Sequence, residues 1–312
     1  MRIAFAGTPE FAVPSLRELV ASGHETVGVF TQPDRPAGRG RKLTSPPVKQ
    51  VAAEAGVPVF QPQRLSRADL ESATAGSGLD LLVVIAFGQI LPQPVLDYAR
   101  LGALNLHASL LPRWRGAAPI ARTLLAGDTV SGVSVMRMVP SLDAGPVVLT
   151  RCCPIAADET AASLHDRLAA LAAQALTAVL EDPEGYIAGA TAQDPERITY
   201  APKLKRDEGR IDWSQPAWAI ERQVRALQPW PCAWTELADG PLRVLASAIA
   251  PGPCPGGEPG TVVSAGRDGI DVVTGQGLLR LLRVQPAGRQ AMAAGAFANA
   301  RTLVGRRLEV DG

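Results

Sequence analysis

The sequence has few of the residues from which metal clusters and disulfide frameworks are built. Its 312 residues include three histidines and four cysteines, with no Cys-x-x-Cys pair. We therefore expect no zinc cluster of histidine and cysteine, and no metal cofactor. The adjacent Cys152 and Cys153 are too close in the chain for an unstrained disulfide. This cysteine usage favours a reduced protein of the cytoplasm.

Strong charge bias and long hydrophobic runs are also missing. The 31 basic and 30 acidic side chains leave a net charge of +1, which excludes a uniformly basic nucleic-acid coat but not a local basic patch. The longest clean apolar run, residues 81–88, is far shorter than the roughly 20 residues of a membrane span. A glutamate and a proline soon follow the first apolar stretch, which favours a strand and a turn over a signal peptide. We therefore expect no membrane partner.

Familiar nucleotide-binding and hydrolase motifs are absent as well. The turn after the first expected strand, Gly7-Thr8-Pro9-Glu10-Phe11, lacks the further glycines that bring a dinucleotide pyrophosphate to a helix N-terminus. The sequence contains neither GxxxxGK[ST] nor GxSxG. These absences do not exclude a nucleotide, but nothing positive points to one.

Up to about residue 185, short apolar strand patterns alternate with helical patterns. The expected strands are 3–6, 27–31, 81–86, 103–107 and 132–138. The expected helices are 11–22, 48–55, 117–126 and 160–180, the last with Asp158 as its N-cap. Such alternation predicts an α/β fold, with an open, mostly parallel, Rossmann-like sheet and helices on both faces.

The chain changes character near residue 200, and its length favours two domains at about 150 residues each. Shorter strand patterns separated by glycine and proline turns follow at 242–248, 261–264, 270–274 and 278–284, with one helical pattern at 217–226. This spacing predicts a smaller OB-like β-barrel domain. We expect a catalytic domain at 1–190, a linker at 191–206 and the second domain at 207–312.

Two polar residues end one of the expected strands. Asn105 and His107 point the same way because strand side chains alternate, and ligands bind at the carboxyl edge of open α/β sheets. A carboxamide beside an imidazole suits a carbonyl whose oxygen becomes negative during attack. The alternative is a polar strand end followed by the turn at Pro112, whose peptide bond could be cis. The two residues alone leave both interpretations open.

Longer motifs carry a resemblance to a known family. The sequence resembles the 10-formyltetrahydrofolate-dependent formyltransferases, and among them the methionyl-tRNA formyltransferase family, over nearly the whole chain. The central motif is Asn-x-His-x-Ser-Leu-Leu-Pro at 105–112, continued by Arg-Trp-Arg-Gly-Ala-Ala-Pro-Ile. Further matching motifs lie at 5–9, 31–40, 141–145, 210–213 and 229–231.

The resemblance implies transfer of a formyl group from 10-formyltetrahydrofolate, a cosubstrate, to the methionine α-amino group of initiator methionyl-tRNA for translation initiation. It implies three catalytic residues, Asn105, His107 and Asp143. Asn105 and protonated His107 would donate hydrogen bonds to the oxyanion. Asp143 would favour the imidazolium, accept the amine proton and pass it to the leaving N10.

Two other functions are compatible with parts of this sequence. A folate-dependent formyltransferase for a small amine, glycinamide ribonucleotide or an amino sugar, would use the same three residues. Such an enzyme would not need the cationic loop that contains Arg39, Arg41 and Lys42, or the second domain at 207–312. A non-catalytic RNA-binding module would have no use for a carboxamide, an imidazole and a carboxylate in this arrangement.

The turn after His107 resembles the folate-binding loop of the family. The resemblance implies that its residues hold the cosubstrate: Ser109, Leu110, Leu111 and Pro112. Phe87 and Gly88, which follow the expected strand 81–86, would form a wall for the pterin ring. Plain core packing is the alternative for Phe87.

We expect the protein to act as a monomer.

Basic residues suggest where the tRNA binds. Five cations and no carboxylate lie between residues 35 and 53, and three of them form the proposed contacts: Arg39, Arg41 and Lys42. A flexible cationic loop can order on phosphates, although such a run is often only solvated surface. Further expected contacts lie in the linker, with surface solubility as the alternative: Lys203, Lys205 and Arg206. The roles of Arg113, Trp114 and Arg115 remain open.

Overall fold

The structure, a computed structural model, describes residues 1–37, 42–238, 240–299 and 301–308. The chain forms two compact units. The first comprises Met1–Pro119, Val130–Ile155 and His165–Ala201, and the second comprises Ile120–Thr129, Ala156–Leu164 and Pro202–Gly312. The second unit therefore includes two earlier segments in addition to the C-terminal part of the chain.

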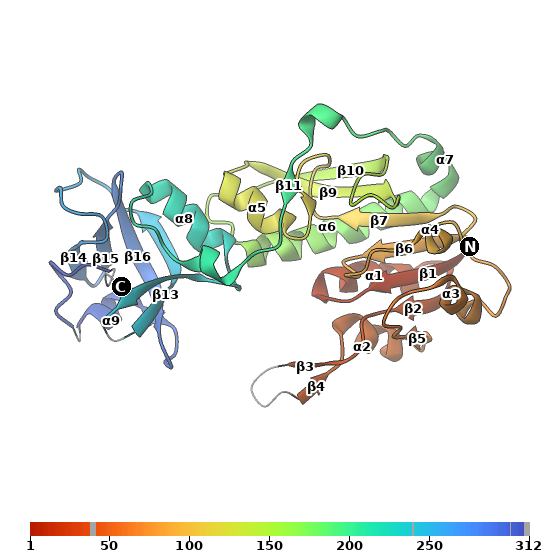
Figure 1. The fold of residues 1–312 in the computed structure, drawn as a ribbon, viewed down its shortest axis with the longest axis horizontal. Coiled ribbons are helices and arrows are strands. Elements are labelled where there is room, and N and C mark those ends of the chain that lie inside the picture. Colours follow the sequence, from red (N-terminus) through yellow and green to blue (C-terminus); the bar gives the residue numbers. More distant parts are fainter. Residues whose placement is uncertain (38–41, 239, 300, 309–312) are drawn as a thin grey trace. The chain divides into compact units, whose positions relative to one another are not determined.

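A seven-stranded sheet forms the centre of the first unit (Figure 1), with the strand order β10-β9-β7-β6-β1-β2-β5. Its strands are β1 (Arg2–Gly7), β2 (Glu25–Phe30), β5 (Val59–Phe60), β6 (Leu81–Ile85), β7 (Ala103–His107), β9 (Val130–Arg137) and β10 (Val147–Pro154). The first five pair in parallel, whereas β9 runs antiparallel to both β7 and β10. The mostly parallel sheet expected from the sequence is confirmed.

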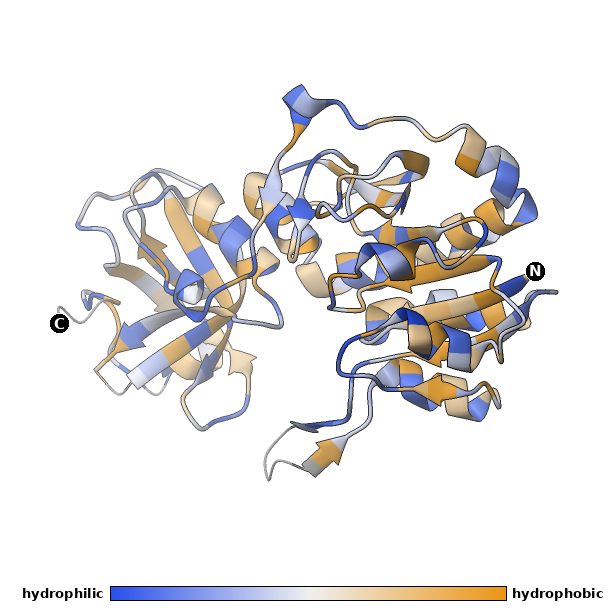
Figure 2. Ribbon diagram, turned by 45° about the vertical axis from the view of Figure 1, so that its right-hand side comes forward, coloured by the Kyte–Doolittle hydropathy of each residue, from blue (hydrophilic) through white to orange (hydrophobic). Residues whose placement is uncertain are grey.

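Both faces of this sheet are covered, and its strands are mostly hydrophobic (Figure 2). Ala4 and Leu82 belong to one apolar cluster with Leu70 and Val95, which lie in helices α3 and α4. The alternate strand residues, such as Phe5, are equally buried. The helices that contribute to this unit are α1 (Val13–Ala21), α2 (Pro47–Glu54), α3 (Arg67–Ala73), α4 (Gln93–Leu96), α6 (Ala161–Glu181) and α7 (Pro183–Ala188).

Helix α6 starts slightly later than the sequence suggested. Its first turn is capped by Thr160, whose Oγ1 accepts a hydrogen bond from the Ser163 amide at 3.2 Å. Thr160 therefore takes the N-cap position expected for Asp158, two residues earlier. Within the described ranges, no helix is long and apolar enough to cross a membrane.

Short elements complete the first unit. A hairpin of β3 (Arg35–Ala37) and β4 (Lys42–Thr44) projects from its body (Figure 1). A separate two-stranded parallel sheet joins β8 (Arg115–Gly116) to β11 (Tyr200–Ala201). Single 3-10 turns lie at η1 (Glu10–Ala12) and η2 (Pro195–Arg197). The β8–β11 pairing ties the segment after residue 190 to the turn that follows His107.

The second unit is built on an antiparallel sheet with the order β12-β13-β16-β15-β14, with β17 on β16. Its elements are β12 (Ala233–Leu237), β13 (Gly240–Ile249), β14 (Val262–Gly266), β15 (Gly269–Val273), β16 (Leu278–Pro286), β17 (Met292–Ala293), α5 (Pro119–Ala126), η3 (Arg206–Gly209), α8 (Ala217–Ala226) and α9 (Ala294–Asn299). The core includes fully buried Trp213, whose Nε1 donates to Thr235 Oγ1 at 3.0 Å. Among the described strands no pairing joins β14 to β12, so closure into an OB-like barrel stays a prediction.

Candidate active site

His107 is the last residue of β7, at the carboxyl edge of the parallel strands. Its side chain is 8% exposed. Its Nε2 lies 2.8 Å from the Trp114 carbonyl oxygen; because a carbonyl only accepts, Nε2–H donates this bond. Its Nδ1 faces Asp143 Oδ2 at 3.7 Å, which is too long for a hydrogen bond. Nδ1 is therefore the ring nitrogen that remains available to another partner.

Asp143 lies in the turn between β9 and β10, and its side chain is 12% exposed. Its backbone has φ +49°, a left-handed conformation that aspartate tolerates better than most residues. Oδ2 accepts a hydrogen bond from the Gly116 amide at 2.8 Å. The carboxylate is thus held from the β8 side, directly beside the imidazole of His107.

Asn105 precedes His107 by two residues and shares its side of the sheet. It pairs with Val84 of β6 and Met136 of β9, and its side chain is half-buried. No residue in the described part of the chain forms a hydrogen bond with its carboxamide. The structure therefore brings Asn105, His107 and Asp143 together at one edge of the sheet, with the Asn105 carboxamide free to meet a ligand.

The turn after His107 is shaped by internal hydrogen bonds, and its Leu111–Pro112 peptide bond is cis. Ser109 is 1% exposed, and its hydroxyl donates to the Arg113 carbonyl at 2.6 Å. Ser134 of β9 donates to the Ser109 carbonyl at 2.8 Å and accepts from the Leu111 amide at 3.0 Å. Ser109 therefore shapes the turn, while Leu110, Leu111 and Pro112 are half-buried at its surface.

The residues after β6 separate into buried and exposed ones. Phe87 is 2% exposed and belongs to the core, which favours packing over a pterin wall for its side chain. Its carbonyl oxygen accepts hydrogen bonds from Thr8 Oγ1 at 3.3 Å and Gln32 Nε2 at 3.2 Å. Gly88 follows with φ +79°, and Ile90 is 84% exposed. The exposed apolar surface after β6 is therefore that of Ile90.

Arg115 and Gln193 form a partly buried contact that the sequence did not suggest. Arg115 is 7% exposed, and its Nε and Nη2 donate to Gln193 Oε1 at 3.0 and 2.8 Å. Gln193 Nε2 in turn donates to the carbonyls of Asp143 and Gly145, both at 2.8 Å. The Arg115 side chain is thus directed at Gln193, a residue within the segment expected to be a linker.

Thr199, also in that segment, holds the turn on its other side. Its Oγ1 accepts from the Trp114 amide and its carbonyl from the Arg115 amide, each at 2.9 Å. Trp114 has φ +63°, and the Arg113 guanidinium lies 4.8 Å from the centre of its ring. The carbonyl that accepts from His107 is therefore held in place by β11 and its neighbours.

The basic loop lies partly outside the described residues. Arg39 and Arg41 fall outside them, as does the side chain of Lys42, whose backbone begins β4. Lys49, another of the five cations, binds both carboxylate oxygens of Asp34 at 2.8 and 2.9 Å. This hydrogen bond is the main cause of the lowered pKa of Asp34. Lys49 therefore anchors the base of the β3–β4 hairpin instead of facing a phosphate.

The three cations at the start of η3 are accessible. Lys203, Lys205 and Arg206 are exposed. The nearby carboxylate of Glu208 is bound instead by Arg122 of α5, and this hydrogen bond is the main cause of its lowered pKa. The Lys205 main-chain amide also donates to Glu208 Oε1 at 2.7 Å, while the side chains of Lys203, Lys205 and Arg206 stay exposed.

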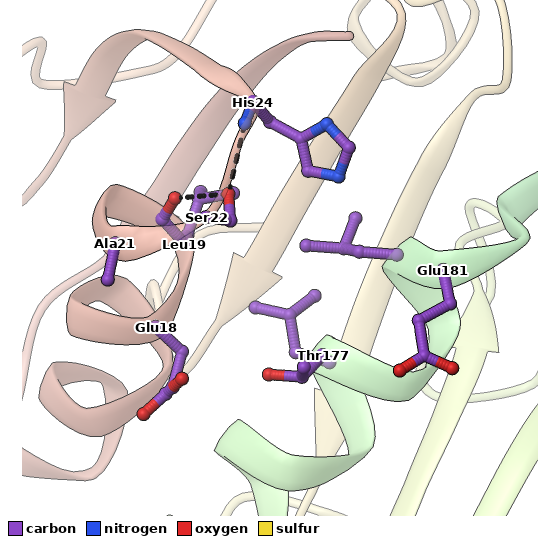
Figure 3. Close-up of a pocket in the computed structure, with 9 residues that line it drawn as sticks. Glu18, Leu19, Ala21, Ser22, His24, Thr177 and Glu181 are labelled. Atoms are coloured by element: carbon purple, nitrogen blue, oxygen red, sulfur yellow. Dashed lines mark hydrogen bonds between the residues drawn. The ribbon is translucent and has the colours of Figure 1, made fainter.

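A cavity of about 320 Å³ lies elsewhere in the first unit, between α1 and α6 (Figure 3). Glu18 and Glu181 lie on opposite sides of it, and Ser22 and His24 complete one end. These two residues precede β2, so the cavity is at the amino edge of the parallel strands. It is lined by none of the residues that the sequence predicted for catalysis or binding.

Comparison with known proteins places these observations in a family. Residues 1–180 match the family described as formyl transferase, and residues 203–302 match the formyl transferase C-terminal domain. The chain belongs to the formyl transferase family. The first match includes β7, the turn after it and Asp143. The second match includes Lys203, Lys205 and Arg206.

The relatives of this family member include proteins that match it over nearly the whole of both chains. It is 50% identical over 308 residues to a methionyl-tRNA formyltransferase of Methylococcus capsulatus, covering 99% of each chain. It is 51% identical over 304 residues to a methionyl-tRNA formyltransferase of Pseudomonas paraeruginosa, covering 96% of each chain.

Solved structures of lower identity share the fold. The sugar 3N-formyl transferase WlaRD matches with a TM-score of 0.66 at 15% identity, covering 93% of this chain and 99% of that one. HypX from Aquifex aeolicus, solved with tetrahydrofolic acid, matches with a TM-score of 0.61 at 17% identity. That match covers 95% of this chain but 46% of HypX. Both likenesses establish the formyl transferase fold.

Proposed function

We propose that this protein transfers the formyl group of 10-formyltetrahydrofolate to the methionine α-amino group of initiator methionyl-tRNA. Half of its residues are identical to those of two methionyl-tRNA formyltransferases along nearly their whole length. The observation that carries the chemistry is the 3.7 Å approach of His107 to Asp143 beside the free carboxamide of Asn105. This constellation is what attack of an amine on a formyl carbon requires.

Asn105 and His107 stabilise the oxygen that becomes negative. Attack of the amine nitrogen on the formyl carbon forms a C–N bond and moves the carbonyl electron pair onto oxygen. The Asn105 carboxamide donates a hydrogen bond to this oxyanion, and so does Nδ1 of His107 when it is protonated. The Trp114 carbonyl fixes the ring through Nε2, so Nδ1 is presented without reorientation.

Asp143 handles the proton. The attacking nitrogen becomes positive in the tetrahedral intermediate and must lose a proton before the product forms. Asp143 accepts this proton, directly or through one water, and the proton passes to N10 of the folate as the C–N10 bond breaks. The carboxylate is suited to this because Gly116 holds Oδ2, while Oδ1 accepts no hydrogen bond from the described residues.

The binding roles follow the chain's organisation. We assign the catalytic domain to residues 1–190, the linker to 191–206 and the tRNA-contacting domain to 207–312. The folate lies against the turn formed by Leu110, Leu111 and Pro112. Ser109 supports this turn through its hydrogen bond to the Arg113 carbonyl, and the backbone at Phe87 and Gly88 borders it.

The chain acts as a monomer in the cytoplasm, and sedimentation at assay concentration tests the oligomeric state.

One assay distinguishes the proposed function from its rivals. Purified protein and 10-formyltetrahydrofolate are incubated with initiator methionyl-tRNA, glycinamide ribonucleotide, a sugar-nucleotide amine, or buffer alone. We expect formyl-methionine on the tRNA and no transfer to either small amine. Transfer to a small amine alone supports the rival enzyme, and no transfer to any acceptor leaves the RNA-binding alternative.

The cations of the basic loop should affect the binding of the tRNA and not that of the folate. If Arg39 and Lys42 contact tRNA phosphates, Arg39→Ala and Lys42→Ala raise KM for methionyl-tRNA and leave KM for the folate little changed. Each lost phosphate contact lowers the slope of log KM against log salt concentration by about 0.7–0.9. Exposed Arg17 on α1 provides a matched control, since Arg17→Ala removes the same charge elsewhere. An unchanged KM for tRNA in both Arg39→Ala and Lys42→Ala would eliminate this role.

A further inference from the structure

We propose that Gln193 is a positioning residue that holds the main chain around Asp143 in its active geometry. This inference rests on the catalytic role proposed for Asp143. Gln193 touches no group that reacts. It acts through the two peptide carbonyls on either side of Ala144, which belong to Asp143 and Gly145.

The hydrogen bonds of Gln193 use the whole capacity of its carboxamide. Oε1 accepts two bonds from Arg115, and Nε2 donates two to the carbonyls of Asp143 and Gly145. These four bonds are short, whereas the further contact of Nε2 with Met136 Sδ is long, at 4.0 Å. A guanidinium has no acceptor and a carbonyl has no donor. The orientation of the amide is therefore dictated by its partners, and glutamate, methionine or leucine cannot reproduce all four bonds.

Arg115 fixes the other end of this contact. It lies in β8, paired with β11, and its side chain is 7% exposed. The Gly116 amide, one residue further along the same strand, donates to the Asp143 carboxylate. The strand therefore holds Asp143 twice, through Gly116 at the side chain and through Arg115 and Gln193 at the main chain.

The turn that carries Asp143 needs such support. Leu142 next to it is 59% exposed, Asp143 itself has φ +49°, and the turn joins two antiparallel strands beyond their last paired residues. Misplacement of a catalytic group by about 1 Å can lower a rate by about 10²-fold. Loss of the Gln193 bonds is therefore expected to reduce kcat rather than substrate binding.

Gln193→Met and Gln193→Glu test the inference. Methionine removes all four hydrogen bonds, whereas glutamate keeps an acceptor for Arg115 and removes the donors to the two carbonyls. We expect kcat to fall about 10–100-fold in both, with KM for tRNA and folate changed by less than about twofold. If the methionine variant fails to fold, the glutamate variant decides, because its contact with Arg115 is retained.

Gln223 of α8 provides a matched control. Its Nε2 also donates to two backbone carbonyls, those of Glu208 and Arg210, at 2.8 and 3.0 Å. Gln223→Met therefore loses the same number of donated main-chain bonds in the other unit. We expect a comparable loss of melting temperature but wild-type kcat. If Gln223→Met lowers kcat as much as Gln193→Glu does, the effect is general destabilisation and the inference is wrong.

A double variant separates this inference from the proposed function. Residues that act as one unit have non-additive effects, so Gln193→Glu should lower kcat little further once Asp143→Ala is present. If Asp143→Ala alone keeps wild-type kcat, the catalytic assignment itself fails. If Asp143→Ala is impaired while Gln193→Glu is normal, or if the two losses multiply, only the positioning role of Gln193 is overturned.

Discussion

Replacing Asn105 or His107 by alanine is expected to lower kcat by at least about 10²–10³-fold, because each change removes one donor to the oxyanion. The effect should appear in kcat, since the hydrogen bonds strengthen as charge develops on the oxygen in the transition state. Initial rates of methionyl-tRNA formylation at saturating folate measure it. Asn105→Ala combined with His107→Ala should abolish most of the remaining turnover, and near-normal turnover in that double variant would refute the assignment.

These variants should remain folded, which makes the kinetic result interpretable. The Asn105 carboxamide makes no hydrogen bond with the described residues, so its removal leaves no partner unsatisfied. His107→Ala removes one hydrogen bond to the Trp114 carbonyl and leaves that acceptor without this partner, which costs about 1–3 kcal/mol of unfolding free energy. His165, which packs edge-on against Phe11, is a suitable control. His165→Ala removes another imidazole of the same unit, and we expect wild-type kcat.

The elements with a buried face were predictable from the sequence. Strand β7 covers 103–107 and α8 covers 217–226, as the apolar spacing indicated, because each must bury one face or both. Strand β10 was missed, although it has eight residues. It lies at the edge of the sheet and its side chains are mostly half-buried or exposed, so no clear apolar alternation marks it. Closure of the antiparallel sheet into a barrel depends on long-range pairing, which local spacing does not encode.

Some residues of the candidate site could be predicted from the sequence, and others could not. Asn105 and His107 follow from alternation at a strand end, whereas Asp143 follows only from resemblance, because a turn brings it back from 36 residues further along the chain. Gln193 and Thr199 carried no signal in the sequence. Thr199 binds only main-chain amides and carbonyls, which every residue has. Gln193 binds two main-chain carbonyls and the Arg115 guanidinium, which lies 78 residues earlier in the chain, so no local pattern links it to the site.

The glycine of the Leu-Asp-Ala-Gly turn leads to the second large expected effect. A Cβ on Gly145 would lie 1.7 Å from the Arg137 carbonyl oxygen and 2.9 Å from its carbon. These are backbone atoms at the base of the turn, where the Arg137 amide donates to Pro146. Gly145→Ala must therefore open the turn between β9 and β10 and move Asp143, which lies two residues earlier.

We expect Gly145→Ala to lower kcat by about 10²-fold or more, although no reacting group is changed. The Gly145 carbonyl also accepts a hydrogen bond from Gln193. The same displacement therefore weakens the hydrogen bonds by which Gln193 holds the main chain around Asp143. Overpacking of this kind costs about 1–3 kcal/mol of unfolding free energy, which denaturant titration measures. Gly23→Ala is the control, because nothing lies within 4 Å of a Cβ there. A Gly145→Ala enzyme with wild-type kcat would mean that the reaction tolerates displacement of Asp143, and that this carboxylate is not the proton acceptor.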